Sequence, residues 1–215
     1  MNTDLAALID HTLLRPDATA AEVRRYCEEA QAHRFRAVCV NPVFVPLVAR
    51  TLAGSAVAAC SVVSFPFGAT ATAAKVAETE WAVGEGADEI DMVIHVGALK
   101  AGETASVQAD IEAVRRTCGA ALLKVIIETC KLTDAEKETA CRLAQAAGAA
   151  FVKTSTGYGG GGATVADVAL MCRVVGPEMG VKASGGIRDR ATALAMVAAG
   201  ATRIGTSGGI ALLAG

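Results

Sequence analysis

Short apolar runs alternate with longer amphipathic stretches along the whole chain. The runs cover residues 7–10, 37–40, 57–65, 89–94, 122–128, 150–154, 181–184 and 202–206. In the stretches between them, apolar residues recur every three or four positions, which is typical of helices with one buried face. In residues 20–33 this face holds Val23, Tyr26, Cys27 and Ala30, and in residues 75–86 we expect Val76, Thr79, Trp81 and Val83. The pattern predicts eight strands alternating with helices.

Local signals at the ends of the predicted helices agree with this division. The spacings Thr19-x-x-Glu22 and Thr133-x-x-Glu136 predict capping boxes, and Thr164-x-x-Asp167 is a weaker example. A glycine ends three helices just before a strand, in residues 85–88, 147–150 and 198–202. The recurrence of this junction indicates a repeated βα unit.

The expected fold class is α/β, a single (β/α)8 barrel domain over residues 1–215. Nearly continuous apolar strands favour a parallel sheet covered by helices, and eight strands are the number that closes a barrel. An open doubly wound sheet is the alternative. No Gly-x-Gly-x-x-Gly follows the first run to support a dinucleotide site.

Composition narrows the classes of function. Of 215 residues, 53% are hydrophobic and 4% aromatic, so the core is aliphatic. The net charge is −2 and there is no basic block, so we expect no binding to nucleic acid or to a membrane surface. No apolar run approaches the roughly 20 residues of a membrane span, and no signal peptide is recognisable. Seven cysteines without a Cys-x-x-Cys spacing are expected to be buried thiols in a reducing cytoplasm.

Four polar residues interrupt the predicted strands. Because side chains alternate along a strand, Asp91, Lys124, Lys153 and Lys182 share faces with each other across the sheet, while the opposite faces are aliphatic. The polar set is therefore expected to point into the barrel, near the strand ends where such barrels carry their chemistry. The four strands are consecutive, which places Lys153 and Lys182 on neighbouring strands.

This constellation predicts covalent catalysis by a lysine. Repulsion between two ammonium groups and their burial both favour a neutral amine, which is the nucleophile that forms a Schiff base. We assign nucleophilic attack to Lys153, the perturbing charge to Lys182 and proton transfer to Asp91. Lys124 is interpreted as an ion-paired or snorkelling residue that lines the pocket.

Several other residues are expected around the same pocket. Asp10 and His11 are expected to close its floor, and Cys39 and Thr156 to line it. His95 is assigned either to the cavity or to packing, and His33 to a solvated helix end. No two histidines have the spacing of metal ligands, so we expect neither a metal nor another cofactor.

Glycine-rich loops follow the last three strands. Backbone N–H groups of such loops bind phosphate in many barrels. The candidate phosphate-binding residues are Gly157, Gly185, Gly186, Gly205 and Ser207. Arg188 either adds charge there or lies on a solvated helix face.

The phrases "IDHTLL", "VCVNP", "EIDMVI", "LKVIIET", "FVKTSTG", "VKASGGIRD" and "RIGTS" together resemble the deoxyribose-phosphate aldolase family, over residues 8–210 in the same order. The resemblance implies a metal-independent class I aldolase that cleaves 2-deoxy-D-ribose 5-phosphate reversibly to acetaldehyde and D-glyceraldehyde 3-phosphate, in deoxyribose phosphate catabolism. It implies that Lys153 forms the Schiff base, with Lys182 and Asp91 in the roles given above. A cytoplasmic homodimer is the assembly that it implies.

The sequence departs from this family at two places, and two rival functions stay open. Tyr158 stands where relatives often have phenylalanine or lysine, and the longer tail ending in tyrosine of some relatives is not expected to act here. The rivals are another phosphate-binding barrel enzyme, such as a transaldolase-like enzyme or an isomerase, and a non-catalytic barrel that binds sugar phosphates.

Overall fold

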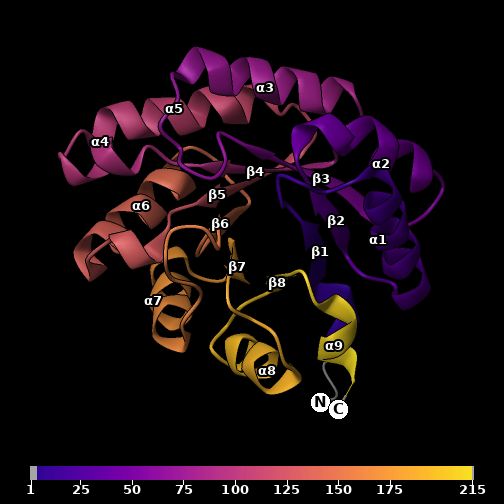
Figure 1. Cartoon of the computed structure of the whole chain (residues 1–215). Coiled ribbons are helices and arrows are strands. Elements are labelled where there is room, and N and C mark those ends of the chain that lie inside the picture. The colour runs from indigo at the N-terminus through magenta and orange to yellow at the C-terminus, as the bar shows by residue number, and fades with distance from the viewer. Residues whose placement is uncertain (1–3, 215) are drawn as a thin grey trace.

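Eight parallel strands form a closed barrel in the computed structural model, which describes residues 4–214 (Figure 1). Each strand pairs with its neighbours in sequence, and β8 closes the ring on β1. The strands are β1 (Ile9–Leu13), β2 (Ala37–Val40), β3 (Ala58–Val63), β4 (Glu89–Val93), β5 (Leu122–Ile126), β6 (Phe151–Lys153), β7 (Gly180–Ser184) and β8 (Arg203–Thr206). The predicted (β/α)8 barrel is confirmed, and the open sheet is excluded.

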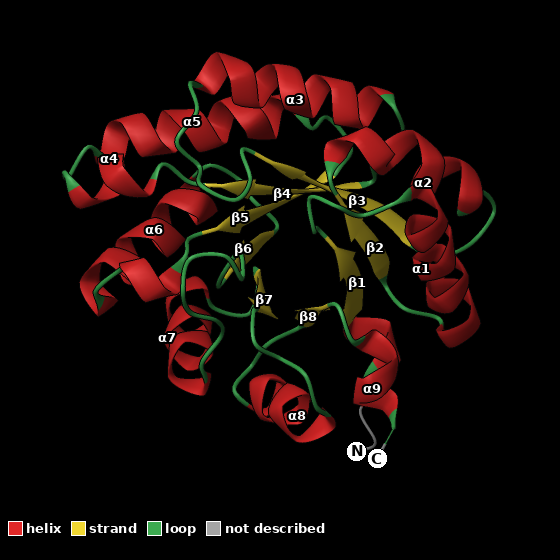
Figure 2. Cartoon of the chain, in the orientation of Figure 1, coloured by secondary structure: helices red, strands yellow, loops and turns green. Residues whose placement is uncertain are grey.

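Helices form an outer ring around the strands (Figure 2). They are α1 (Ala20–His33), α2 (Val45–Thr51), α3 (Thr72–Gly84), α4 (Val96–Lys100), α5 (Thr104–Thr117), α6 (Asp134–Ala146), α7 (Val165–Val175), α8 (Arg190–Ala198) and α9 (Gly209–Leu213). Short 3-10 turns occur at η1 (Ala6–Leu8), η2 (Pro42–Phe44) and η3 (Thr129–Lys131).

Several strand boundaries differ from the sequence prediction, most clearly those of the first and fifth strands. The first strand was expected at residues 7–10, but residues 6–8 form η1 and the strand begins at Ile9, where pairing with β2 and β8 becomes possible. The fifth strand ends at Ile126 and does not reach residue 128. Glu128 has a left-handed backbone with φ 57°, which turns the chain out of the sheet.

The predicted helix ends are confirmed. Both capping boxes form, and the Thr164 side chain accepts a hydrogen bond from the Asp167 backbone N–H. Gly86, Gly148 and Gly200 have φ between 76° and 110°, a conformation that favours glycine. The glycines in these three junctions therefore reverse the chain between each helix and the next strand.

Two separate sets of side chains fill the two faces of the barrel wall. The outward face packs its aliphatic side chains under the helices, with Ile90, Met92, Val125, Val152 and Ile204 fully or almost fully buried. The inward face carries a smaller apolar cluster, mainly from β2 and β3, and charged residues on β1 and on β4 to β8. The alternation read from the sequence therefore separates core from interior correctly.

Helix α3 buries a face rotated from the one expected: Thr79 is buried as predicted and Val76 and Val83 are half-buried, but Trp81 is exposed. Its buried residues are Lys75, Thr79 and Ala82, whereas Trp81 is 43% exposed. The Lys75 ammonium is fully buried because it donates to Asp110 Oδ2 at 2.6 Å and to the Val93 carbonyl oxygen at 3.0 Å. This ion pair joins α3 and α5 to the end of β4, and apolar periodicity gives no indication of it.

The cysteines also depart in part from expectation. All seven are free thiols, and five are buried, but Cys130 is exposed and Cys172 is half-buried. Within residues 4–214, no helix combines the length and apolarity needed to cross a bilayer.

Candidate active site

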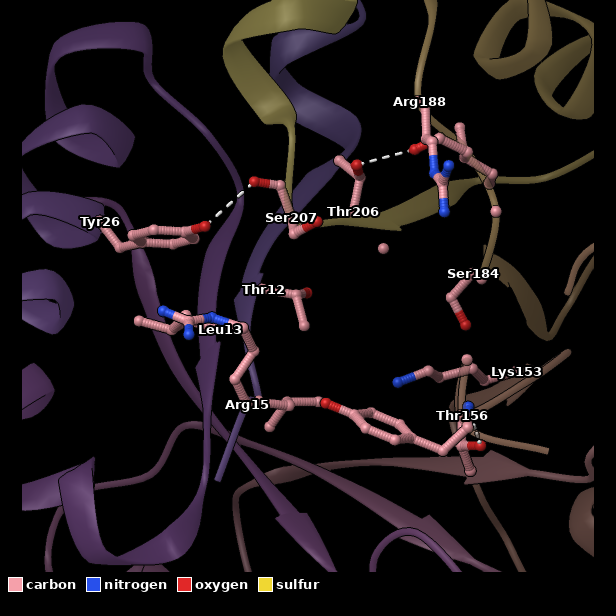
Figure 3. Close-up of a pocket in the computed structure, with 17 residues that line it drawn as sticks. Thr12, Leu13, Arg15, Tyr26, Lys153, Thr156, Ser184, Arg188, Thr206 and Ser207 are labelled. Atoms are coloured by element: carbon pink, nitrogen blue, oxygen red, sulfur yellow. Dashed lines mark hydrogen bonds between the residues drawn. The ribbon is translucent and has the colours of Figure 1, made fainter. Parts of the chain in front are cut away.

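A cavity of about 370 Å³ opens at the carboxyl ends of β1, β6, β7 and β8. Its walls come from the ends of these strands and from the loops that follow them (Figure 3). The sequence-predicted residues in its walls are Lys153, Thr156, Gly157, Gly185, Gly186, Gly205 and Ser207. The closed barrel therefore brings most of the predicted site together around one cavity.

Lys153 presents its amine to this cavity. It is the last residue of β6, where β-sheet pairing fixes its backbone against Ile126 and Lys182. Figure 3 shows the side chain extending into the open space between Ser184, Thr12 and Thr156. Its Nζ atom lies 2.7 Å from Asp91 Oδ2. Lys153 is thus the one lysine in the cavity wall, and it is also connected to the interior.

Asp91 connects three lysines. Its Oδ2 atom accepts hydrogen bonds from Lys153 and from Lys182, both at 2.7 Å, and its Oδ1 atom accepts one from Lys124 at 2.7 Å. Asp91, Lys124 and Lys182 are fully buried. Their strands place them at matching heights, since Asp91 is in register with Lys124 and Lys153 with Lys182. The predicted proximity of Asp91 to the two lysines is confirmed.

A second group of ions lies deeper in the barrel. Asp10 binds Lys182 through Oδ2 at 2.5 Å and Arg203 through Oδ1 at 2.7 Å. Glu89 binds Arg203 at 2.9 Å and Lys124 at 2.6 Å. These contacts join two carboxylates and one arginine to the Asp91 group. We call the whole set the interior charge cluster, which consists of Asp10, Glu89, Asp91, Lys124, Lys153, Lys182 and Arg203.

The interior charge cluster holds four basic side chains and three carboxylates. With every group ionised, the cluster carries one excess positive charge. The half-exposed Arg36 lies outside the cluster and approaches Glu89 at 3.9 Å. Three of the basic groups each contact two or more carboxylates, whereas Lys153 contacts only Asp91. Loss of one proton makes the cluster neutral, and Lys153 is the member with the fewest carboxylate contacts and an opening to the cavity.

Burial and pairing fix the charges of the other members. Burial alone would raise the pKa of Asp91, but Lys124, Lys153 and Lys182 hold that pKa well below its ordinary value. Burial alone would lower the pKa of Lys182, but Asp10 and Asp91 raise it above its ordinary value. These contacts therefore favour the ionised form of Asp91 and the protonated form of Lys182.

The structure corrects the positions of three residues expected in the wall of the pocket. Asp10, Cys39 and Lys124 do not line the cavity, because they project from earlier positions in their strands and lie beneath it. Cys39 faces Cys60 on the neighbouring strand. Thr156 does line the cavity, and its backbone N–H donates to Glu128 Oε1 at 3.2 Å.

Two groups of acids and thiols come close enough to share a cation. They are Cys39, Cys60 and Asp91, and Asp10, Cys60 and Glu89. The Lys124 ammonium already contacts Glu89, Asp91 and the Cys60 sulfur, at 2.6, 2.7 and 3.4 Å. The cation of this region is therefore a lysine, and neither group supports a metal centre.

None of the histidines lies in the cavity wall. His11 was expected at the cavity floor, but it follows Asp10 on β1 and so points outward, where Nε2 lies 2.7 Å from Glu29 and the ring stacks on Tyr26. His95 caps α4 through Nδ1, and His33 is the last residue of α1. The charged groups at and next to the cavity are therefore lysine, arginine and carboxylate side chains.

Glycines allow the loops and the buried lysine to approach closely. A side chain on Gly162 would meet the Gly185 carbonyl oxygen at 2.3 Å, so the β6–α7 and β7–α8 loops touch through backbone. A Cβ at Gly205 would lie 3.1 Å from the Lys182 Cε atom and 2.9 Å from the Ser184 Cβ atom. Gly205 therefore leaves the space that Lys182 occupies.

Four charged or phenolic residues of the site were not assigned by the sequence. Arg203 stands two positions before Gly205 on the same strand face, and Glu89 two before Asp91, so alternation gave a signal for both. Arg15 and Tyr26 line the cavity from a loop and from α1, where no periodicity indicates a site.

Comparisons with known proteins agree with the geometry. Residues 5–215 match the family model described as DeoC/LacD family aldolase. A protein of Rhodospirillum rubrum named deoxyribose-phosphate aldolase is 62% identical over 211 residues, which cover 98% of this chain and 89% of that protein. One of Brevibacillus brevis with the same name is 56% identical over 207 residues, covering 96% and 94%. The solved tetrameric deoxyribose phosphate aldolase of Aeropyrum pernix superposes with a TM-score of 0.93 at 33% identity, covering 99% of this chain and 92% of that one.

Proposed function

The chain belongs to the DeoC/LacD family of aldolases, and we propose that Lys153 carries the reaction as a Schiff base. The activity is that of a carbon–carbon lyase, which cleaves 2-deoxy-D-ribose 5-phosphate reversibly to acetaldehyde and D-glyceraldehyde 3-phosphate. The observation that carries the assignment of Lys153 is its position. It alone among the lysines of the interior charge cluster lies in the cavity wall, and it is bonded to Asp91 at 2.7 Å.

The chemistry begins with the free amine. Lys153 Nζ adds to C1 of the open-chain sugar, and loss of water gives an iminium ion. The C2–C3 bond then breaks as the C3 hydroxyl loses its proton, so that D-glyceraldehyde 3-phosphate leaves and the bonding electrons form an enamine with the iminium nitrogen as acceptor. Protonation of the enamine at C2 and hydrolysis release acetaldehyde and restore the amine.

The interior charge cluster supports each of these steps. Lys153 contacts one carboxylate, whereas every other cation in the cluster contacts at least two, so Lys153 is the amine least held by ion pairs. Asp91 Oδ2 is hydrogen-bonded to Lys153 and can exchange protons with it, while Lys182 keeps that carboxylate ionised. Lys182 thus acts as a charged neighbour that is itself paired with Asp10.

The phosphate group is assigned to the other end of the cavity. Gly157, Gly185, Gly186, Gly205 and Ser207 belong to its walls, and the left-handed backbones of Gly185 and Gly186 have φ of 87° and 79°. Glycine allows a phosphate oxygen to approach the backbone N–H groups of such loops. Lys153 and these loops line the same cavity, as a sugar phosphate with a reacting carbonyl at its other end requires.

Trapping of the Schiff base tests the proposal. Protein treated with acetaldehyde and sodium borohydride should gain one ethyl group on the peptide containing Lys153, and the Lys153→Ala variant should gain none there. Lys100→Met, which changes a half-exposed lysine on α4, is the matched control and should be labelled like the wild type. Wild-type protein without a label at Lys153 would favour a barrel that binds sugar phosphates without catalysis.

Product analysis separates the rival enzymes. Incubation with 2-deoxy-D-ribose 5-phosphate should yield equal amounts of acetaldehyde and D-glyceraldehyde 3-phosphate. An isomerase would yield a sugar of unchanged mass, and a transaldolase-like enzyme would need a second aldehyde as acceptor.

The expected assembly is a homodimer in the cytoplasm. The free thiols support a reducing compartment, and the Aeropyrum pernix relative is described as a tetramer, so subunits of this family do associate. Light scattering of the purified protein measures the assembly; a mass of one chain or of four would contradict the dimer.

A further inference from the structure

The cavity wall has a one-sided charge. Among residues 4–214, its lining includes three basic side chains, Arg15, Lys153 and Arg188, and no carboxylate. Lys153 belongs to the reacting end of the cavity. The two arginines are therefore left to account for the charge at the other end, and such a surface attracts a dianion.

The two arginines flank one loop. Arg188 follows β7 and Arg15 follows β1, and β8 lies between these strands in the closed barrel. The loop after β8 carries Thr206 and Ser207, which also line the cavity. In Figure 3, Arg188 and Arg15 lie on opposite sides of the cavity, with Thr206 and Ser207 above and Lys153 below the space between them. The β8 loop therefore lies between the two loops that carry these arginines.

The ion pairs that Arg15 forms in this structure are weak enough to be replaced by a contact with another anion. Its guanidinium lies 2.7 Å from Asp17 and 2.6 Å from Glu22, with the Arg15 and Asp17 side chains 50% and 72% exposed. Ion pairs between such exposed groups are weak. Glu22 is also bound by the backbone N–H of Thr19 at 2.8 Å, so the capping box of α1 persists without Arg15. Arg15 can therefore turn toward a stronger anion without opening the helix end.

The remaining wall offers no further cation at this end. Tyr158, on the β6–α7 loop, contributes a phenol ring that packs edge-on against Phe65 with ring centroids 5.5 Å apart. Arg188 forms no ion pair within residues 4–214 and is exposed. Charge recognition of a phosphate dianion therefore falls to the two arginines.

We propose that Arg15 is a specificity-determining residue that binds the phosphate of the sugar phosphate from the β1 side and so selects phosphorylated over unphosphorylated aldehydes. This inference rests on the proposed function, because it assigns the phosphate to the same cavity. Arg15 acts in ground-state binding, since it lies in the wall opposite the β7 loop and belongs to no part of the interior charge cluster.

The experiment compares two substrates in matched variants. The kcat and KM are measured with 2-deoxy-D-ribose 5-phosphate and with 2-deoxy-D-ribose for the wild type, Arg15→Gln, Arg15→Lys and Arg25→Gln. Arg25 is a suitable control because it is an exposed arginine on α1, pairs with Glu29 at 3.6 Å and lies outside the cavity wall. Loss of one charge-assisted hydrogen-bonding group should raise KM for the phosphorylated sugar about 10-fold to 100-fold in Arg15→Gln, with kcat and the unphosphorylated reaction unchanged. Arg15→Lys should recover part of the loss, and Arg25→Gln should change neither substrate.

The other possible outcomes test the assignment of Arg15 and the proposed function separately. An equal loss with both substrates in Arg15→Gln, or no loss with either, overturns the assignment of Arg15. Wild-type protein that cleaves neither sugar would overturn the proposed function instead. In that case calorimetry with inorganic phosphate still tests Arg15, since weaker binding in Arg15→Gln than in Arg25→Gln supports the contact and equal binding overturns it.

Discussion

Lys153 and Lys182 bind the same carboxylate oxygen, Oδ2 of Asp91, each at 2.7 Å. The two lysines differ in their other carboxylate contacts and in their access to the cavity. Lys182 has a second carboxylate partner, Asp10, and no opening to the cavity, whereas Lys153 has the cavity on its other side. A proton is therefore held more firmly on Lys182, and one amine is kept as an ion while its neighbour is placed to react.

Replacement of Asp91 by asparagine should abolish most of the activity. The amide has the same shape but cannot exchange protons with Lys153, and it leaves three buried lysines without their common counter-ion. We expect kcat to fall about 100-fold to 10,000-fold, the range for loss of a general acid–base group. Steady-state kinetics with 2-deoxy-D-ribose 5-phosphate measure the loss, and circular dichroism checks the fold. A kcat within threefold of the wild type would remove Asp91 from proton transfer.

Replacement of Lys182 by methionine should move the acidic limb of the pH–rate profile to higher pH. The interior charge cluster then has three basic groups for three carboxylates. With Lys153 protonated, the variant cluster is neutral, whereas the wild-type cluster carries one excess positive charge. We expect a shift of about one unit or more in the profile of kcat/KM, because a charge within 4–6 Å changes a pKa by that amount. Lys100→Met, on the surface, should leave the profile in place. An unchanged profile in Lys182→Met would contradict the electrostatic role of Lys182.

The sequence predicts the barrel because two independent periodicities agree: the alternation of side chains in the strands and the three-to-four-residue spacing of apolar side chains in the helices. Alternation assigned Asp91, Lys124, Lys153 and Lys182 to the interior face, and register in the closed barrel then brings them within hydrogen-bonding distance. Glycines and capping boxes located the helix ends to within a residue or two. These features depend on residues close in sequence, which is why the sequence alone predicts them.

The parts that the sequence did not predict depend on contacts between distant residues. Lys182 was expected beside Lys153, but its second partner, Asp10 on a strand 172 residues earlier, was not predicted. Lys75 was not expected to be buried, because its partner Asp110 is on another helix. Trp81 was placed in the core by its hydrophobicity, yet tertiary packing buries the other side of α3. Such pairings are set by the fold as a whole.

Acid should destabilise the protein through the buried carboxylates. Lys182, Lys124 and Arg203 outweigh the effect of burial and lower the pKa of Asp10, and the lysines around Asp91 lower its pKa likewise. A carboxylate with a depressed folded-state pKa stabilises the protein above its unfolded value of 3.8, and that contribution is lost as the pH falls through the folded value. Urea unfolding between pH 7 and pH 2 should show stability falling below about pH 4, by about 1.4 kcal/mol per pH unit for each such group. Asp10→Asn should reduce this slope; an equal slope in wild type and variant would contradict the prediction.

Replacement of Gly205 by alanine should displace Lys182. The added methyl group would lie 3.1 Å from the Lys182 Cε atom and 2.9 Å from the Ser184 Cβ atom, and this overpacking should cost about 1–3 kcal/mol of stability. Activity should fall as well, because the contact of Lys182 with Asp91 is disturbed. Gly208→Ala is the matched control, since its nearest neighbour, Thr206 Oγ1, is at 3.9 Å. Equal effects of the two substitutions on urea unfolding and kcat would show that the space beside Lys182 is not limiting.

The charge count of the interior can be tested without touching a residue near the substrate. Glu89 and Arg203 bind each other at 2.9 Å in the interior charge cluster, beneath Asp91 and outside the cavity wall. Glu89→Gln raises the excess positive charge from one to two, so the acidic limb of the kcat/KM profile should move to lower pH. Arg203→Met lowers the excess to zero, so the limb should move to higher pH.

The double variant Glu89→Gln/Arg203→Met restores an excess of one, and its pH profile should return to that of the wild type. Each single variant leaves a buried charge short of a partner and should lose about 3–5 kcal/mol of stability, whereas the double variant should lose less than the sum. Urea unfolding and pH profiles of the four proteins measure both effects. If the two single variants moved the limb in the same direction, the shifts would reflect structural damage, and the balance of charge would not explain the free amine of Lys153.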